Sequence, residues 1–282
     1  MNNDFLLILS RVAQDRQSGS VELTLRTLEQ VLTTLPGLAP GQLESLPCLL
    51  AQLQTVRPSM TVLENAMQSC LDGLRSEGLA NAGRVLSNVR SELKGATDQV
   101  AGQAVRLLAP GMTVMTHSRS SVVLAALKRA RAERVNISVV VTQGSPANEG
   151  VSLARELAAA EIPVTLITDA QMGLVMAEVD LVLTGCDAWY QDGVFINKVG
   201  TFLLALAARE LQKPFWVLAD RFKVSSRAAG TAILEEMPVS ELAEGRLTVT
   251  EQANLGFRNT YFEPIPTRLI TGRVGEQELY TC

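Results

Sequence analysis

The chain has 282 residues, one histidine and a formal net charge of −4. This length exceeds what a single hydrophobic core usually needs, which favours two domains. No apolar run approaches the ~20 residues that span a bilayer, and the absence of a basic cluster argues against direct binding of nucleic acid.

The first part of the chain has a helical pattern. Apolar residues recur at spacings of three and four from Ser20 to Leu35, where Pro36-Gly37 ends the pattern. Further helices are predicted over residues 41–54, 61–77 and 79–108. No alternating strand pattern interrupts this region, so we expect a helical N-terminal domain over residues 1–108.

From Met112 onward, short β-rich runs alternate with helical segments. The predicted strands cover residues 112–115, 136–141, 164–167, 179–183 and 215–218, and the predicted helices cover residues 121–134, 150–161, 169–178 and 201–211. This alternation predicts an α/β fold with a parallel, Rossmann-like sheet over residues 109–282. The boundary between the two domains is expected at Ala109-Pro110-Gly111.

The segment VDLVLTGCDAWYQDGVFINKVGT, residues 179–201, is the most informative one. A buried strand ends at Asp187, and a second apolar run leads into Asn197-Lys198 and a helix. Ligands of open α/β sheets bind at the carboxyl ends of the strands. Lys198 offers charge, Asn197 an amide, and the helix start at Gly200-Thr201 free backbone N–H groups, which together predict a phosphate site beside an acid. The alternative is a turn-forming aspartate with a solvated lysine, and the residues alone leave both open.

Three other segments invite a functional and a plain interpretation. Residues 116–121, THSRSS, follow the first strand, and Ser120 or Ser121 is expected to cap the next helix. No acid or second histidine lies near Ser118 in the sequence, and the G-x-S-x-G motif of hydrolases is absent. Residues 142–150 read on their own as a turn with Gly and Pro. Arg57-Pro58 reads plainly as a helix stop and restart with Arg57 exposed.

Taken together, these segments resemble the family of the alpha, beta and delta subunits of translation initiation factor two-B, methylthioribose-1-phosphate isomerase and ribose-1,5-bisphosphate isomerase. The resemblance covers essentially the whole chain and is most specific over residues 112–224, in MTHSRSSVVLAALKRA, IPVTLITDAQMGLVM and GCDAWYQDGVFINKVGTFLLALAARELQKPFWVLAD. Arg57-Pro58-Ser59 is similar to the Arg-Pro-Thr of the family's N-terminal domain. Residues 259–266, NTYFEPIP, are similar to its closing Asn-x-x-Phe-Glu/Asp-x-x-Pro segment.

The resemblance implies a sugar phosphate bound between the two domains. By position, Asp187 matches the catalytic acid/base aspartate, Asn197 and Lys198 match a substrate-contacting pair, and Arg57 matches a phosphate-contacting arginine. The turn with Ser118, Ser120 and Ser121 is expected to hold phosphate and hydroxyl groups. An aldose-to-ketose conversion needs a group near C1 and C2 to move a proton and polar groups to stabilise the transition state.

Several departures from the isomerases weigh against catalysis. The catalytic cysteine is replaced by Ser118, whose hydroxyl is far less acidic than a thiol with a pKa of ~8.5. The Arg-Gly-Ala that binds substrate has no clear counterpart, the nearest segment being residues 16–20, RQSGS. The usual Arg-Pro after the second strand is Ser145-Pro146. Glu149 stands where the methylthioribose enzyme has a substrate-contacting glutamine, and its charge would repel a phosphate unless it pairs or takes up a proton.

The cysteines indicate the setting of the protein. Cys48, Cys70, Cys186 and Cys282 are scattered without CxxC spacing, which argues against a metal site and favours a reducing, cytoplasmic setting. The N-terminal apolar patch lacks the basic residues of a signal peptide. Cys186 precedes Asp187 where the family usually has alanine, so we expect it to be a buried core residue rather than a relocated catalytic thiol.

Three functional hypotheses follow. The first is a protein that binds a phosphorylated sugar or nucleotide and has lost or weakened isomerase chemistry. The second is an active aldose–ketose isomerase that uses Asp187, and the third is a translation-factor-like regulatory or scaffold subunit. The resemblance also implies a homodimer through the C-terminal domain, to which residues 202–208 and 215–217 are candidates to contribute. No metal or other cofactor and no membrane contact are expected.

Overall fold

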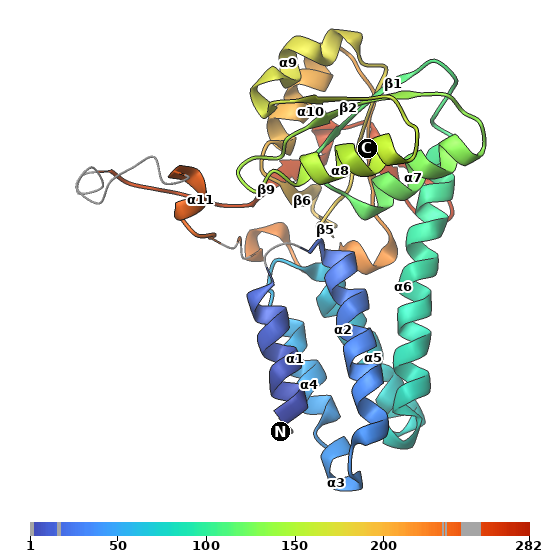
Figure 1. Ribbon diagram of the computed structural model, residues 1–282, viewed down its shortest axis with the longest axis vertical. Coiled ribbons are helices and arrows are strands. Elements are labelled where there is room, and N and C mark those ends of the chain that lie inside the picture. Colours follow the sequence, from blue (N-terminus) through green and yellow to red (C-terminus); the bar gives the residue numbers. More distant parts are fainter. Residues whose placement is uncertain (1–2, 16–17, 233, 235, 244–254) are drawn as a thin grey trace.

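The computed structural model describes residues 3–15, 18–232, 234, 236–243 and 255–282. It consists of a helical N-terminal part and an α/β part, stacked along the long axis of the molecule (Figure 1). The helices of the first part are α1 (Asn3–Gln14), α2 (Ser20–Thr34), α3 (Pro40–Leu43), α4 (Leu46–Thr55), α5 (Thr61–Glu77) and α6 (Ala82–Val105). The predicted fold class is therefore confirmed.

The predicted helix over residues 41–54 is wrong in one respect, since it is divided into α3 and α4. Pro47 occupies the second position of α4. Proline has no backbone N–H, and its ring clashes with the carbonyl of the residue four positions earlier, so a helix tends to restart there rather than continue through it.

Helix α6 belongs to both parts of the molecule (Figure 1). Its first half packs Val85, Leu86 and Leu93 into the core of the helical bundle. Its second half packs Val100 and Ala104 into the core of the α/β part. The two cores therefore meet along one continuous helix, and the domain boundary at residue 108 stays a prediction.

The main sheet of the α/β part has seven strands in the order β11-β10-β7-β4-β1-β2-β3. All neighbouring pairs are parallel except the last at one edge, β10 with β11. The chain reverses its direction of winding between β1 and β4, and this switch point is where open α/β sheets bind ligands. The strands are β1 (Thr113–His117), β2 (Ser138–Thr142), β3 (Val164–Ile167), β4 (Leu181–Thr184), β7 (Phe215–Leu218), β10 (Gly272–Val274) and β11 (Leu279–Thr281).

Alternate residues of the strands pack against helices on opposite faces of the sheet. Val114 belongs to a core with α7 (Ser121–Ala132) and α8 (Glu149–Ala159). Its neighbour Met115 belongs to a second core with α9 (Met172–Val175) and α10 (Thr201–Glu210). This is the period of two that a strand buried on both faces requires.

The predicted helix over residues 169–178 is also wrong as a single element. It consists of the short α9 flanked by two 3-10 turns, Asp169–Gln171 and Met176–Glu178. The side-chain oxygen of Gln171 accepts a hydrogen bond from the backbone N–H of Thr168 at 3.1 Å. This bond belongs to a capping box between Thr168 and Gln171, which fixes the start of the helical segment at Thr168.

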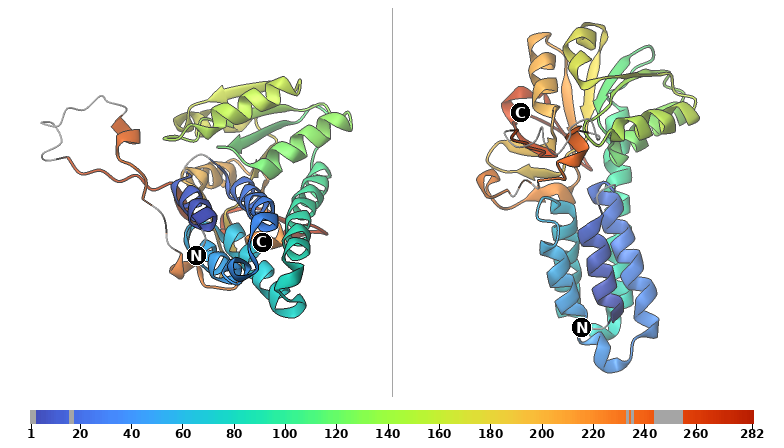
Figure 2. Two further views of the ribbon diagram at one scale, coloured as in Figure 1. Left: turned by 60° about the horizontal axis from the view of Figure 1, so that its bottom comes forward. Right: turned by 60° about the vertical axis from the view of Figure 1, so that its left-hand side comes forward.

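A second, four-stranded sheet was not predicted. Its order is β8-β5-β6-β9, and its strands are β8 (Val224–Ser225), β5 (Ala188–Tyr190), β6 (Val194–Lys198) and β9 (Phe262–Pro266). Strand β6 pairs antiparallel with β9, so that Asn197 lies opposite Glu263. Helix α11 (Ser240–Ala243), which comes between β8 and β9 in the chain, lies away from the body of the molecule (Figure 2).

The structure tests the predictions for Cys186, for residues 215–217 and for membrane contact. Cys186 is 2% exposed and packs in the core with α10, as expected. Residues 215–217 form the interior strand β7 and are buried, which removes them from any dimer surface. Among the described residues, none of the helices combines the length and apolar character needed to cross a membrane.

Candidate functional site

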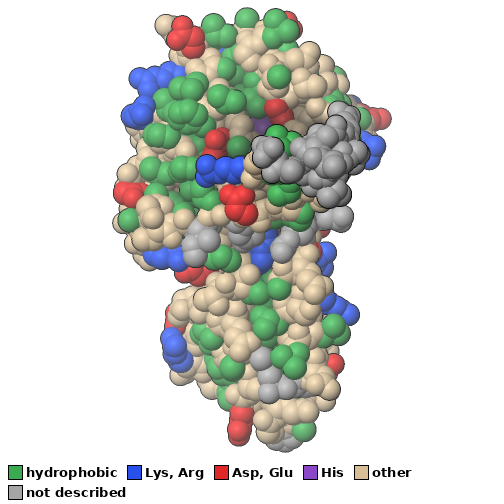
Figure 3. All heavy atoms as spheres, turned by 90° about the vertical axis from the view of Figure 1, so that its left-hand side faces the viewer, with side chains coloured by type: hydrophobic (Ala, Val, Ile, Leu, Met, Phe, Trp, Pro, Cys, Tyr) green, Lys and Arg blue, Asp and Glu red, His purple; other side chains and the backbone are tan. Residues whose placement is uncertain are grey.

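A pocket opens at the switch point of the main sheet, where the carboxyl ends of β1 and β4 lie side by side. Residues from the helical part complete its wall. Seven of the eight predicted site residues line this pocket, and Ser121 lines a smaller adjoining one that shares Asp187 and Asn197. The seven are Arg57, Ser118, Ser120, Glu149, Asp187, Asn197 and Lys198. Figure 3 shows acidic side chains beside the purple histidine in a hollow of the α/β part.

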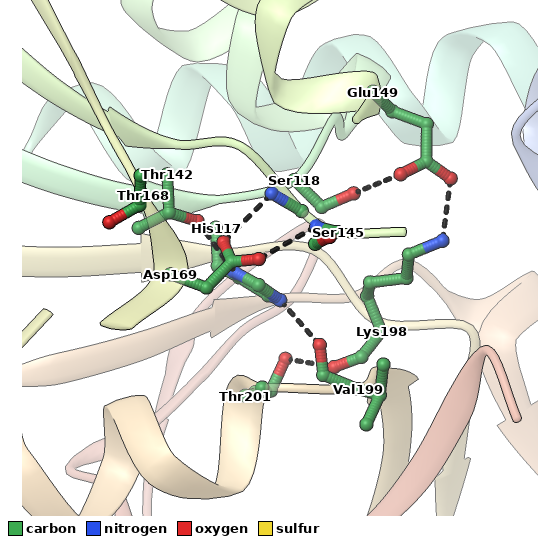
Figure 4. A network of polar contacts seen from close by, with 12 residues as sticks. His117, Ser118, Thr142, Ser145, Glu149, Thr168, Asp169, Lys198, Val199 and Thr201 are labelled. Atoms are coloured by element: carbon green, nitrogen blue, oxygen red, sulfur yellow. Dashed lines mark hydrogen bonds and ion pairs between the residues drawn. The ribbon is translucent and has the colours of Figure 1, made fainter. Parts of the chain in front are cut away.

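The single histidine stabilises the floor of the pocket. His117 is 2% exposed, its Nε2 lies 2.7 Å from the carbonyl oxygen of Val199, and its Nδ1 lies 2.6 Å from the hydroxyl of Thr142 (Figure 4). Because a carbonyl can only accept, Nε2 carries the proton and Nδ1 accepts from Thr142. Burial lowers the pKa of His117, which keeps the ring neutral. With both nitrogens engaged, the ring positions the turn before α10 and has no nitrogen left for proton transfer to a ligand.

The turn after β2 is held next to the turn after β1. Asp169 accepts hydrogen bonds from the backbone N–H groups of Gly144 at 2.9 Å and Ser145 at 2.7 Å (Figure 4). A Cβ on Gly144 would lie 2.9 Å from the Cα of Ser118, so only glycine permits this approach. The segment 142–150, which on its own reads as a plain turn, therefore brings the start of α8 to Ser118.

Glu149, Lys198 and Ser118 form one connected cluster in the pocket. Lys198 Nζ lies 2.7 Å from Glu149 Oε1, and the Ser118 hydroxyl donates to Glu149 Oε2 at 3.2 Å (Figure 4). The same ammonium group lies 3.7 Å from the centre of the Tyr261 ring, a cation–π contact. The sequence places no acid near Ser118, but the fold does.

The start of α10 does not offer the free N–H groups that the sequence predicts, and this expectation is wrong. Glu263 Oε1 accepts hydrogen bonds from the backbone N–H groups of Gly200 and Phe202, both at 2.8 Å. Burial raises the pKa of Glu263, and its bonds to the α10 backbone oppose that rise. A carboxylate from β9 thus already satisfies the helix terminus, because the unpredicted second sheet carries it there.

Asp187 lies where the two pockets meet. It accepts a hydrogen bond from the Ser20 hydroxyl of α2 at 3.2 Å, which links the helical part to the site. Burial raises the pKa of Asp187, and the nearby charges of Lys223 and Lys198 oppose that rise. The carboxyl group therefore has the raised pKa that a proton-donating group requires.

Lys223 is a site residue that the sequence did not predict. It is 4% exposed and lines the adjoining pocket with Asp187, Ser120 and Ser121. Its backbone N–H donates to the carbonyl oxygen of Asp220, whereas its ammonium group makes no hydrogen bond or ion pair with the residues that the structure describes. The feature of the sequence that could have identified Lys223 is its position shortly after β7, the strand next to β4. A buried lysine beside a pocket is a natural contact for an anionic group of a ligand.

Two arginines connect the helical part to the site. Arg57, which the plain interpretation leaves exposed, is 4% exposed and donates to the carbonyl oxygen of Asp15 at 2.5 Å. Arg119 bridges the two parts, with Nε 2.9 Å from Glu156 of α8 and Nη1 3.2 Å from Glu22 of α2. Arg16, the displaced arginine of the RQSGS segment, lies outside the described residues.

The side-chain amide of Asn197 is less available to a ligand than expected, because its nitrogen donates a hydrogen bond to the Thr201 hydroxyl at 2.9 Å. Within the described parts of the chain, no group of three His, Cys, Asp or Glu side chains is placed to hold a metal ion. The arrangement of lysines, an arginine, hydroxyls and a carboxyl with a raised pKa suits a small, hydroxylated anion.

Comparison with known proteins identifies the family to which this chain belongs. The model of the initiation factor 2 subunit family matches residues 5–281. A Pyrococcus horikoshii protein named putative translation initiation factor eIF-2B subunit 2-like is 32% identical over 273 residues, covering 96% of this chain and 94% of that protein. The ribose 1,5-bisphosphate isomerase of Methanocaldococcus jannaschii is 30% identical over 230 residues, covering 79% of this chain and 73% of the isomerase.

Solved structures agree with these matches. The Pyrococcus horikoshii translation initiation factor eIF-2B superposes with a TM-score of 0.87 at 29% identity, over 100% of this chain and 98% of that one. The 5-methylthioribose 1-phosphate isomerase of the same organism has the same fold, with a TM-score of 0.79 at 17% identity over 98% of this chain and 84% of that one. The chain therefore belongs to the initiation factor 2 subunit family, which includes factor-like proteins and sugar-phosphate isomerases.

Proposed function

We propose that this protein binds a phosphorylated sugar at the switch-point pocket and that its isomerase chemistry is lost or weakened. The observation that carries the proposal is the arrangement of Lys198, Lys223 and Arg57 around Asp187 in two adjoining pockets. Buried cations attract phosphate oxygens, and Asp187 and the serine hydroxyls offer partners for sugar hydroxyls. The isomerase relatives support a sugar phosphate over other small anions.

The loss of catalysis rests on Ser118. Its hydroxyl replaces the thiol expected from the isomerases, and this hydroxyl donates a hydrogen bond to Glu149. A hydroxyl needs a strong base to exchange a proton at neutral pH. His117 is the usual side chain for that task, but both of its ring nitrogens are already engaged.

An active isomerase is the second candidate, and the raised pKa of Asp187 favours it. A protonated Asp187 can deliver a proton to a sugar oxygen as an enediol forms. The third candidate, a regulatory or scaffold subunit, draws support from the factor-like relatives. In each case we propose a cytoplasmic protein.

We also propose a homodimer that uses the exposed face of α10. Leu203 is 64% exposed and Leu206 is 41% exposed, whereas Leu204 and Ala208 on the same helix are buried. Exposed leucines on one helix face favour a partner surface over solvent.

Calorimetry of the purified protein with ribose 5-phosphate, ribulose bisphosphates and adenosine monophosphate tests the proposal, with NMR to detect conversion. Binding of a phosphorylated sugar without conversion supports a binding protein. Binding with aldose-to-ketose conversion moves the assignment to the isomerase, and absence of binding to all of these ligands favours the scaffold.

A further inference from the structure

Lys198, the cation expected to bind the ligand, already has an anion beside it. We propose that the Glu149 carboxylate occupies the phosphate subsite of this pocket as an internal counter-ion, which an anionic ligand must displace. The inference rests on the proposed function, because it concerns the same pocket. It assigns to Glu149 a part in choosing between ligands.

The geometry of the carboxylate resembles that of a bound anion. Each of its oxygens faces a donor from a different turn, the Lys198 ammonium at 2.7 Å and the Ser118 hydroxyl at 3.2 Å (Figure 4). One strong cationic donor and one hydroxyl are the partners that a phosphate group takes in proteins. The two oxygens of Glu149 therefore mark positions that two phosphate oxygens would occupy.

The surroundings keep the ammonium group at this place. Lys198 has a side chain only 7% exposed, and its ammonium group lies 3.7 Å from the centre of the Tyr261 ring. The hydroxyl of Tyr261 donates to Glu241 at 2.6 Å, which fixes the ring. Because Lys198 is enclosed in this way, a ligand reaches it by replacing Glu149.

Glu149 is the member of the pair with room to move. Its side chain is 27% exposed, against 7% for Lys198. It is the first residue of α8, where a carboxylate remains favourable for the helix whether it points into the pocket or out. A turn of this side chain toward solvent releases both donors without moving the strands.

The replacement of the Glu149 carboxylate by an incoming anion determines which ligands bind. A monoanion from solution, such as acetate, competes for Lys198 with the Glu149 carboxylate, which has the same charge. Because Glu149 is attached to the protein, its effective concentration is on the order of millimolar or above. A doubly charged phosphate ester is attracted more strongly by Lys198 and Arg57, which line the same pocket as Glu149, and it prevails. The pocket should therefore prefer dianionic phosphate groups over monoanions and neutral sugars.

The test uses sulfate, which stays dianionic at neutral pH, and acetate as the monoanion. Calorimetry at pH 7.5 compares the wild-type protein with Glu149→Gln, which keeps the size of the side chain and removes its charge. Glu161→Gln is the matched control, since it makes the same charge change at an 83% exposed side chain outside the pocket.

Glu149→Gln should bind sulfate about 10-fold more tightly or better, the factor expected for regaining one charged hydrogen bond. It should also bind acetate measurably, and Glu161→Gln should match the wild type. The gain must disappear when Lys198→Ala is added to Glu149→Gln, because the released ammonium is its source. Glu149→Ala repeats the comparison if the glutamine variant fails to fold.

Other outcomes separate the two proposals. Equal sulfate affinity in the wild type and Glu149→Gln, with binding lost in Lys198→Ala, overturns the counter-ion role and leaves the anion pocket standing. A gain that survives Lys198→Ala also overturns it. Absence of sulfate binding in every variant overturns both the counter-ion role and the anion pocket.

Discussion

Replacement of Glu263 should destabilise the protein and weaken the ligand site together. Glu263 Oε1 accepts two backbone hydrogen bonds, from Gly200 and Phe202, at the start of α10. Hydrogen bonds to a charged group contribute about 1.5–3 kcal/mol each when buried, and a helix N-cap contributes about 0.5–2 kcal/mol. Since Glu263 is only partly buried, water replaces part of the loss. We expect Glu263→Ala to lower the free energy of unfolding by about 2–3 kcal/mol and Glu263→Gln by about 1 kcal/mol.

The assay is equilibrium unfolding in urea, followed by far-ultraviolet circular dichroism. Glu210→Gln is the matched control, because Glu210 is exposed in the last turn of the same helix, where a negative charge opposes the helix dipole. That control should change stability by less than about 0.5 kcal/mol, in the stabilising direction. A loss below about 0.5 kcal/mol in Glu263→Ala would refute the capping role.

The functional consequence follows from the pairing of β6 with β9. Asn197 lies opposite Glu263 in that pairing, and the turn after Lys198 leads directly to the capped helix. If the cap holds this turn, Glu263→Ala should weaken sulfate binding even at urea concentrations near zero, where the protein is fully folded. Unchanged sulfate affinity would restrict Glu263 to stability.

Four further predictions concern the site and its surroundings. Lys198→Ala should weaken binding of a phosphorylated sugar by about 1.5–3 kcal/mol in calorimetry, and unchanged affinity would remove Lys198 from the site. Burial raises the pKa of Asp187, so ionisation of this carboxyl lowers the stability of the folded protein as pH rises through the folded-state pKa. The melting temperature of Asp187→Asn should therefore exceed that of the wild type at pH 7.5, and the difference should shrink toward pH 4. Arg119→Ala should lower the free energy of unfolding by about 1 kcal/mol through loss of the Glu22 and Glu156 contacts, and an unchanged urea midpoint would contradict that. Leu203→Glu should convert the proposed homodimer to a monomer in sedimentation velocity, whereas a dimer that persists would exclude this face of α10.

The sequence was sufficient for the elements whose signal is local. Alternating buried residues such as Val114 and Met115, separated by amphipathic helices, predicted the parallel sheet, and the polar residues after its strands predicted the pocket. Two segments were predicted as single helices although the structure divides them, the first just before Pro47.

The second sheet depends on contacts between distant segments and was missed. Strand β6 pairs with β9 almost 70 residues later in the chain. Consequently the sequence did not show that Glu263 caps α10, or that Tyr261 covers Lys198. Glu149 reaches Ser118 only because Asp169 holds the turn after β2, and Lys223 becomes a site residue only when β7 lies beside β4.

The proposed function requires the switch-point pocket to bind a phosphorylated sugar through Lys198. The most direct measurement is calorimetric titration of the wild-type protein and Lys198→Ala with ribose 5-phosphate, with unphosphorylated ribose as the control ligand. The wild type should bind the phosphate ester and not ribose, and Lys198→Ala should bind the ester at least about 10-fold more weakly. Equal binding of the ester by both proteins, or equal binding of ribose and its phosphate by the wild type, would contradict it.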